Sequence, residues 1–195
     1  MDIETGTTFH GAGAARRLTF DGRSLSAQSL TDIAFRRQEF LVGISSEAMA
    51  RIERTHTSLQ NLMERKMPIY GVTTGFGDSG NRTISFHQSE QLQKNLVSYL
   101  LCGSGPRLAP EVSRAILTVR LNSMAKGFSG VSPGLIERLR LHLERDWLPV
   151  IPREGSLGAS GDLIPLAYLA QNIQGEGEVH ANGSIRPMRE VLAVA

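Results

Sequence analysis

The chain has 195 residues, of which 41% are hydrophobic and 21% charged, a composition typical of a globular protein with its own core. The net charge is +2 and the arginines are spread along the chain, which gives no support for a nucleic-acid-binding protein. Every apolar run falls short of the roughly 18 residues of a membrane span, and the single cysteine excludes an internal disulfide and suits a reducing cytoplasm.

The N-terminal segments are weakly patterned. Residues 1–15 are rich in Gly, Thr and Ala and are interpreted as a flexible leader. Residues 18–25 are predicted to form a short hairpin that turns at Asp21-Gly22. The mixed segment from Ser29 to Phe40 is interpreted as a helix. A folded domain is therefore expected over 16–195.

Helix signals dominate the middle of the chain. A helix is predicted over 47–65, capped by Ser45 and ended by Pro68, because its apolar residues recur with a helical period. Similar signals predict three further helices, over 86–102, 110–126 and 133–146. Their apolar stripes favour a helical bundle. Cys102, in an apolar run at the end of the first of these three, is predicted to be buried and unreactive.

A glycine-rich loop separates the first two of these long helices. It reads Ile-Tyr-Gly-Val-Thr-Thr-Gly-Phe-Gly-Asp-Ser-Gly over residues 69–80. Four glycines within ten residues predict an irregular loop, and such loops on a helical scaffold usually carry function. A tyrosine such as Tyr70, taken alone, would more often be a core or surface side chain.

The C-terminal part begins with a second glycine-rich loop, Glu-Gly-Ser-Leu-Gly-Ala-Ser-Gly-Asp-Leu-Ile-Pro over residues 154–165. A helix is predicted over 161–172, followed by a hairpin over 178–185 that turns on Asn182-Gly183. Pro187 is predicted to start a last helix. Because that helix reaches the end of the chain without a polar stop, we expect it to be continued.

The centre of the second loop offers an unusual chemistry. Small residues let backbone atoms approach closely, so the Gly161 nitrogen can attack the Ala159 carbonyl carbon and close a five-membered ring. Loss of water from the ring and from Ser160 would leave a methylidene-imidazolone, a strong electrophile. The alternative is a glycine-rich loop that only caps a helix. A serine-hydrolase elbow and a phosphate-binding loop are excluded, because their glycine and lysine positions are absent.

Both glycine-rich loops resemble the signatures of the histidine and aromatic amino acid ammonia-lyase family, which includes related aminomutases. The second match runs from Gly155 to Leu166. The resemblance implies a mainly α fold, the N-terminal portion of the ammonia-lyase/fumarase-like helical bundle with short β-hairpins. It also implies 4-methylidene-imidazol-5-one (MIO), formed from Ala159-Ser160-Gly161 without any metal.

The resemblance implies roles for further residues. Tyr70 aligns with the family's catalytic tyrosine, which removes a β-proton while the group made from Ser160 takes the substrate amine. Gly77 matches a position near the substrate, and Tyr99-Leu100 match a pair that lines the pocket for the substrate side chain. Tyr-Leu is nearest to the phenylalanine type, with a hydroxyl that suits a polar ring. Tyr99 could instead pack in the core.

Several functions remain open at this point. The first is elimination of ammonia from phenylalanine or tyrosine to an aryl acrylate. The alternatives are a 2,3-aminomutase, a histidine ammonia-lyase and a non-catalytic helical interaction subunit. The family's chains are roughly two and a half times this length and form homotetramers. We therefore expect a C-terminal part or complementary chain to supply the residues that bind the substrate carboxylate.

Overall fold

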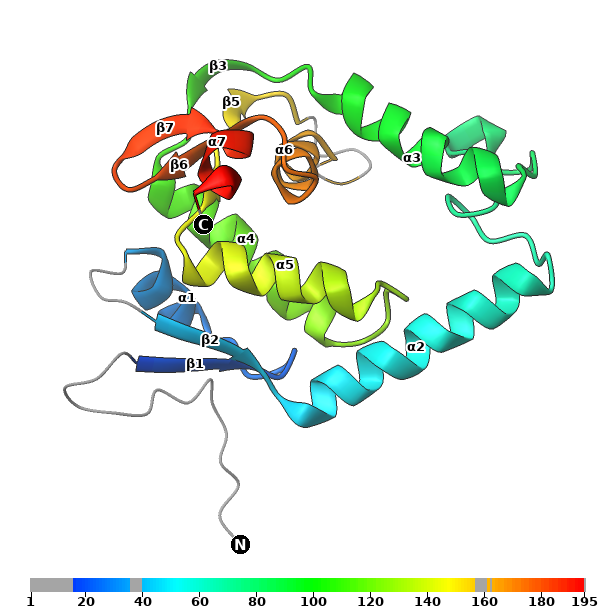
Figure 1. Cartoon of the computed structure of the whole chain (residues 1–195), viewed down its shortest axis with the longest axis horizontal. Coiled ribbons are helices and arrows are strands. Elements are labelled where there is room, and N and C mark those ends of the chain that lie inside the picture. The colour runs from blue at the N-terminus through cyan, green and yellow to red at the C-terminus, as the bar shows by residue number, and fades with distance from the viewer. Residues whose placement is uncertain (1–15, 36–39, 157–160, 162, 195) are drawn as a thin grey trace, which may run out of the picture.

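The computed structural model describes residues 16–35, 40–156, 161 and 163–194 (Figure 1). Within these ranges the fold is mainly α, as predicted, with three small sheets. The helices are α1 (Ala27–Ala34), α2 (Ser46–Glu64), α3 (Phe86–Leu100), α4 (Pro110–Ala125), α5 (Pro133–Glu144), α6 (Leu163–Ile173), α7 (Met188–Ala193) and the short 3₁₀ helix η1 (Gly77–Ser79). The strands are β1 (Arg16–Phe20), β2 (Phe40–Ile44), β3 (Ser104–Arg107), β4 (Leu148–Pro149), β5 (Pro152–Glu154), β6 (Glu178–Ala181) and β7 (Ser184–Pro187).

The helices begin where the capping residues predict. The Ser45 hydroxyl accepts from the Ala48 N–H at the start of α2, and the Ser132 hydroxyl accepts from the Leu135 N–H at the start of α5. Ser85 forms a reciprocal capping box with Gln88 at the start of α3. The helices predicted from 47, 86, 110 and 133 are thus confirmed, with ends one or two residues earlier than expected.

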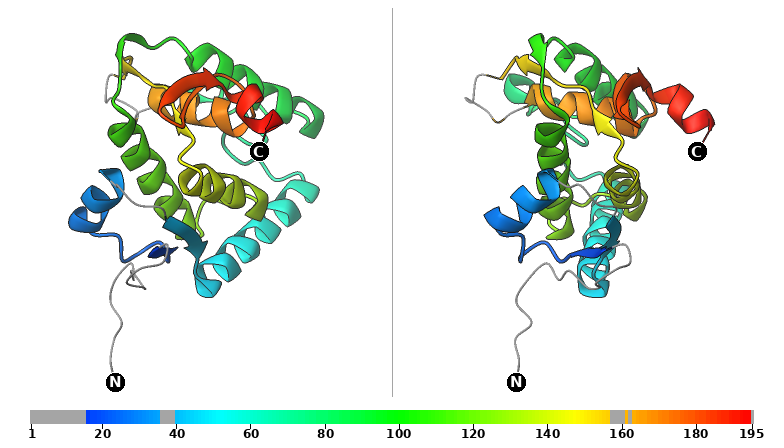
Figure 2. Two further views of the ribbon diagram at one scale, coloured as in Figure 1. Left: turned by 60° about the vertical axis from the view of Figure 1, so that its left-hand side comes forward. Right: turned by 90° about the vertical axis from the view of Figure 1, so that its left-hand side faces the viewer.

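The main core lies where α4 and α5 pack against β1, β2 and their neighbours. Its fully buried members come from elements far apart in the sequence, which ties the N-terminal strands to the central helices. They include Leu18, Phe20, Ile33, Ile52, Leu117, Leu121, Ile136, Leu139 and Leu143. α2 and α3 extend away from this centre and are joined by the loop over 69–80 (Figures 1 and 2). That loop is irregular, as predicted.

The hairpin predicted at Asp21-Gly22 is wrong. β1 pairs with β2 in parallel, so the partner strand follows α1 rather than a tight turn. The Asp21 carboxylate instead accepts from the N–H groups of Arg23 and Ser24 and turns the chain toward α1. The helix expected over residues 29–40 is partly wrong, because α1 covers Ala27–Ala34 and Phe40 begins β2.

The outer edge of β2 is closed by side chains of α5. The Val42 N–H donates to Glu144 and the Val42 carbonyl accepts from Arg140, at 2.8 and 2.9 Å. An unpaired strand edge is a site for unwanted pairing with other chains, so this arrangement protects the small sheet. The Arg140 guanidinium also donates to Glu137, and this bond holds the pKa of the Glu137 carboxyl below its usual value.

The C-terminal elements agree with the predictions. α6 corresponds to the helix expected over 161–172 but begins at Leu163, and β6 and β7 form the hairpin that turns on Asn182-Gly183. α7 follows Pro187. The sequence did not predict β3 and β5, which pair with each other. Cys102, expected to be buried, is exposed in the described chain.

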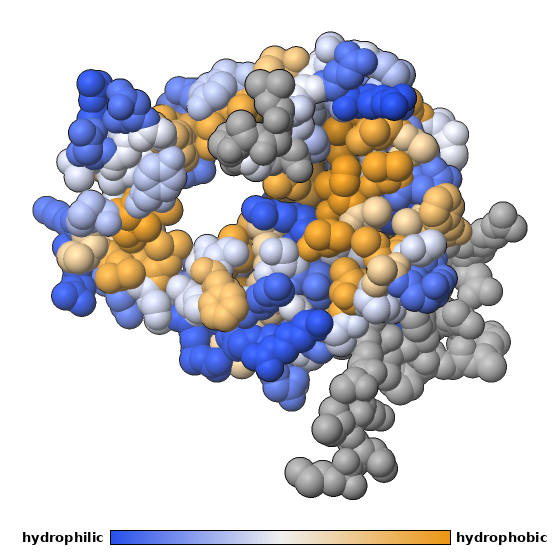
Figure 3. Space-filling view, turned by 180° about the vertical axis from the view of Figure 1, so that it is seen from behind, coloured by the Kyte–Doolittle hydropathy of each residue, from blue (hydrophilic) through white to orange (hydrophobic). Residues whose placement is uncertain are grey.

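One apolar face of α4 faces outward. Val112 and Val119, two apolar residues of this helix, are 43% and 47% exposed. With Ile116 and Pro165 they line a groove of about 430 Å³ between α4 and the start of α6. The view from behind shows apolar surface on this side and an opening through the molecule (Figure 3). Among the described helices, none combines the length and the hydropathy needed to cross a membrane.

Candidate functional site

The loop between α2 and α3 holds Tyr70 in a defined position. The Gly77 N–H donates to the Tyr70 hydroxyl oxygen over 2.8 Å, although the tyrosine side chain is 65% exposed. Thr74, which is buried, accepts from the Gly71 N–H and donates to the Gly75 carbonyl. The loop is therefore folded by its own hydrogen bonds. The Tyr70 side chain is open to solvent, and its oxygen accepts one backbone hydrogen bond.

The loop is also attached to α3. The Ser89 hydroxyl donates to the Val72 carbonyl, and the Gln93 side-chain amide donates to the Gly71 carbonyl. Ser89 is 7% exposed, which leaves its hydroxyl little access to water. Neither residue belongs to a motif that the sequence indicates. The only available signal was their spacing of four, which places them on one face of a helix.

Tyr99 and Leu100 lie in the last turn of α3. Tyr99 is 61% exposed, so the alternative in which it packs in the core does not hold for the described chain. Leu100 is half-buried. A phenol and an isobutyl group thus follow each other in the sequence at the end of the helix whose earlier turns hold the Tyr70 loop.

The end of α3 also meets the segment that leads into the second glycine-rich loop. β3 pairs antiparallel with β5, with Ser104 opposite Glu154. A Cβ placed on Gly155 would lie 2.8 Å from a methyl group of Ile164 and 3.3 Å from the Gly103 Cα, so glycine is needed for this close approach. Since α6 contacts α3, one flank of the second loop is tied to α3 and the other to β3, the strand that follows α3.

Gly161 is the one residue of the predicted ring that lies within the described residues. Gly161 has φ of +93°, a conformation that other residues rarely adopt, and a Cβ built there would meet no described residue within 4 Å. The residue whose nitrogen would close the ring thus has a backbone conformation that favours glycine. Ala159 and Ser160 lie outside the described residues. Residues 1–15, interpreted as a leader, do so as well.

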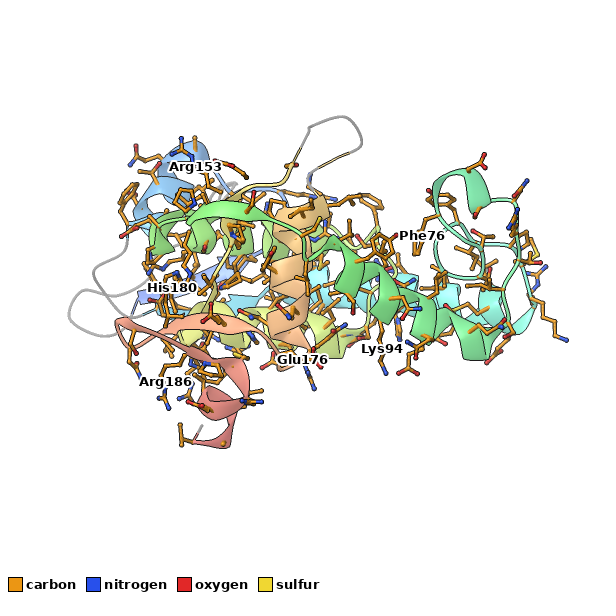
Figure 4. The ribbon with its side chains drawn as sticks, turned by 90° about the horizontal axis from the view of Figure 1, so that it is seen from above. Phe76, Lys94, Arg153, Glu176, His180 and Arg186 are labelled. Carbon is orange, nitrogen blue, oxygen red and sulfur yellow. The ribbon has the colours of Figure 1, made fainter. Side chains whose placement is uncertain are left out.

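Charged side chains lie where α3 and α6 meet. Lys94 donates to Glu90 one turn earlier on α3, over 2.7 Å, and this bond raises the pKa of the Lys94 ammonium. Glu176, just after α6, acts on Lys94 in the same direction (Figure 4). Within the described ranges, no group of three or more His, Cys, Asp or Glu side chains could hold a metal ion.

The structure therefore joins the predicted site residues in two ways. Tyr70 and Gly77 are linked directly by a hydrogen bond. Tyr99, Leu100 and the flanks of the second loop are linked through α3 and through β3, which follows it. Within the described part of the chain, no hydrogen bond joins Tyr70 to Tyr99 or to Gly161. α3 and β3 thus connect the three segments that the motifs identify.

Comparison with known proteins identifies one family. The family model for aromatic amino acid lyases matches residues 25–195. Histidine ammonia-lyase from Alkaliphilus metalliredigens is 37% identical over 180 residues, which are 92% of this chain and 35% of that protein. MIO-dependent tyrosine 2,3-aminomutase from Streptomyces globisporus is 38% identical over 176 residues, 90% of this chain and 32% of that protein.

Solved structures give the same result. The crystal structure of tyrosine aminomutase from Streptomyces globisporus superposes with a TM-score of 0.83 at 36% identity. The match covers 90% of this chain and 32% of that chain. The chain therefore spans about a third of the length of the curated relatives that it matches.

Proposed function

The chain belongs to the aromatic amino acid lyase family, and we propose that it carries the base, the prosthetic-group segment and part of the substrate pocket of an enzyme that eliminates ammonia from an aromatic L-amino acid. The substrate would be phenylalanine or tyrosine and the product an aryl acrylate. Residues 16–195 would form the MIO-bearing N-terminal domain of that enzyme. Its single cysteine suits the cytoplasm.

The observation that carries this proposal is the hydrogen bond between Gly77 and Tyr70. The Gly77 N–H donates to the Tyr70 oxygen, and this bond fixes the place of the atom that would take the proton from the substrate. The exposure of the Tyr70 side chain leaves it open to a substrate. Tyr70 would thus act as the general base at the β-carbon, with Gly77 as the donor that holds its oxygen.

The prosthetic group expected in this family would be built from Ala159, Ser160 and Gly161. When formed, it supplies an electrophile for the substrate amine, which no ordinary side chain offers. The positive φ of Gly161 is compatible with that group. The tight contact of Gly155 with Ile164 and Gly103 would anchor the loop beside the end of α3.

The pocket for the substrate side chain would include Tyr99 and Leu100. Their phenol ring and isobutyl group can contact an aromatic ring through apolar surface, while the Tyr99 hydroxyl can bind a ring hydroxyl. This favours phenylalanine or tyrosine over histidine, although a histidine ammonia-lyase is among the relatives. A 2,3-aminomutase is the second candidate, because relatives of similar identity carry that name.

The rest of the active site would come from other chain segments. Because the relatives are about three times as long as the chain, we propose that a C-terminal part or a complementary chain binds the substrate carboxylate. The outward apolar face of α4 would be covered in the assembled enzyme, for which we propose a homotetramer.

The test is product analysis with the assembled enzyme. Phenylalanine, tyrosine and histidine would be supplied separately, and aryl acrylates, urocanate and β-amino acids would be separated by chromatography. The proposal predicts cinnamate or coumarate as the main product. A β-amino acid as the main product would establish the aminomutase instead. Assembled protein that binds these amino acids but converts none would support the non-catalytic alternative.

A further inference from the structure

Two side chains of α3 hold the tyrosine loop at the residues that follow Tyr70. Gln93 donates to the carbonyl of Gly71, the next residue after Tyr70, and Ser89 donates to the carbonyl of Val72. The two donors are four residues apart, so they project from one face of α3 as a pair. The two side chains therefore hold the backbone of the residues that directly follow the proposed base.

Hydrogen bonds within the loop connect these two contacts to the Tyr70 oxygen. Gly71 is held by Thr74 as well as by Gln93, and the Ile84 N–H donates to the Thr73 carbonyl and closes the loop's far side. The Gly77 N–H then holds the Tyr70 oxygen. These hydrogen bonds form a continuous chain of contacts from α3 to the Tyr70 oxygen.

The same helix carries the proposed substrate pocket. Gln93 and Tyr99 are six residues apart on α3, which at 1.5 Å per residue is about 9 Å along the helix axis. A rigid helix keeps this spacing constant. The hydrogen bonds of Ser89 and Gln93 thus connect the base-bearing loop to the element that would bind the substrate ring.

We propose that Ser89 and Gln93 are positioning residues, which hold the Tyr70 oxygen at a fixed place relative to the substrate. The inference rests on the proposed function, in which Tyr70 is the base. Neither side chain needs to touch the substrate. Gln91, two residues earlier on α3, makes a similar side-chain bond but donates to Asn95 on its own helix, so a loop contact is not general for this surface.

The first test uses amide hydrogen exchange on the full chain. Gln93→Glu has nearly the same shape, but its carboxylate cannot donate to the Gly71 carbonyl. Ser89→Ala removes the second donor. Gln91→Glu is the matched control, because it makes the same chemical change on the same helix without touching the loop. We expect exchange in residues 69–77 to rise by about tenfold in Gln93→Glu and Ser89→Ala, but not in Gln91→Glu.

The second test measures steady-state turnover in the assembled enzyme. A misplaced base costs about 10²-fold in kcat, while KM should change little because Tyr99 and Leu100 remain in place. Unchanged loop exchange in both variants would overturn the proposal whatever the turnover shows. Raised exchange with unchanged kcat would overturn the positioning role alone. A wild-type enzyme without turnover would contradict the proposed function. The positioning role would then be lost with it, whereas a measured rise in loop exchange would still show that Ser89 and Gln93 hold the loop.

Discussion

The Gly77 N–H and the Tyr70 hydroxyl oxygen are 2.8 Å apart across a turn of seven residues. This bond places a donor on the oxygen that we propose as the base, and the donor is a backbone group, which cannot rotate away. The site therefore starts from a fixed oxygen rather than from a freely moving side chain.

Replacing Tyr70 with Phe should lower turnover by about 10²–10⁴-fold, because the ring is kept and only the ionisable oxygen is lost. The side chain is largely exposed, so the melting temperature should stay close to that of the wild type. The prosthetic group should still form, as measured by its near-ultraviolet absorbance. Turnover close to the wild-type value would remove Tyr70 from the mechanism.

Replacing Ser160 with Ala should prevent formation of the electrophile. Ring closure with two dehydrations makes the wild-type chain about 36 Da lighter than its sequence predicts, and the variant cannot form the methylidene group. Ser156→Ala, in the same loop but outside the ring, should keep the mass difference. Mass spectrometry of the intact chain is the measurement, and a wild-type chain with the unmodified mass would contradict the proposed cofactor.

Replacing Arg51 with Ala should destabilise the fold. The Arg51 guanidinium donates to the carbonyls of Asp21, Ala125 and Lys126, which joins α2 to the end of α4 and the end of β1. Its loss leaves these carbonyls without their donor and should lower the free energy of unfolding by about 1–3 kcal/mol. Urea unfolding would measure this effect.

The control for Arg51 is Arg54→Ala, on the same helix at an exposed position. It should change the free energy of unfolding by less than about 0.5 kcal/mol. Equal effects of the two substitutions would mean that the hydrogen bonds from Arg51 to the three carbonyls do not contribute measurably to the free energy of unfolding.

Stability should fall as the pH drops below about 6.5, the ordinary pKa of histidine. Burial lowers the pKa values of both His142 and His180. The unfolded chain therefore binds more protons than the folded chain in this range, so acid favours unfolding, and the contribution is fully present above pH 6.5.

His142→Phe should flatten this dependence, because phenylalanine can keep the edge contact with Trp147 without titrating. The measurement is the change in unfolding free energy between pH 8 and pH 5. The variant also loses a bond to the Arg138 carbonyl, so only the slope is informative. A slope equal to that of the wild type would show that His142 does not contribute.

The sequence predicts most helices because their ends carry local signals. Ser45, Ser85, Ser132 and Pro110 each stand at the start of a helix, and the structure confirms each one. The pairing of β1 with β2 could not be predicted in the same way. The partners are parallel and separated by α1, whereas Asp21-Gly22 is a strong local turn signal that the fold uses differently.

The candidate site shows the same division between local motifs and long-range contacts. Tyr70 and Gly77 belong to one motif, so the sequence indicates both. Ser89 and Gln93 are polar residues on a helix surface, where side chains usually contact only water, and nothing nearby in the sequence reveals the loop that they hold. For α4, apolar residues occur on two faces, and the pattern does not distinguish Leu117, which is buried, from Val119, which is not.

The most direct test of the account is the identity of the product that the assembled enzyme makes from phenylalanine, tyrosine and histidine. With wild-type protein, we predict that absorbance and chromatography detect cinnamate from phenylalanine or coumarate from tyrosine, together with an equal amount of ammonia. Urocanate from histidine as the sole product, or no ammonia from any of the three, would contradict the proposed function.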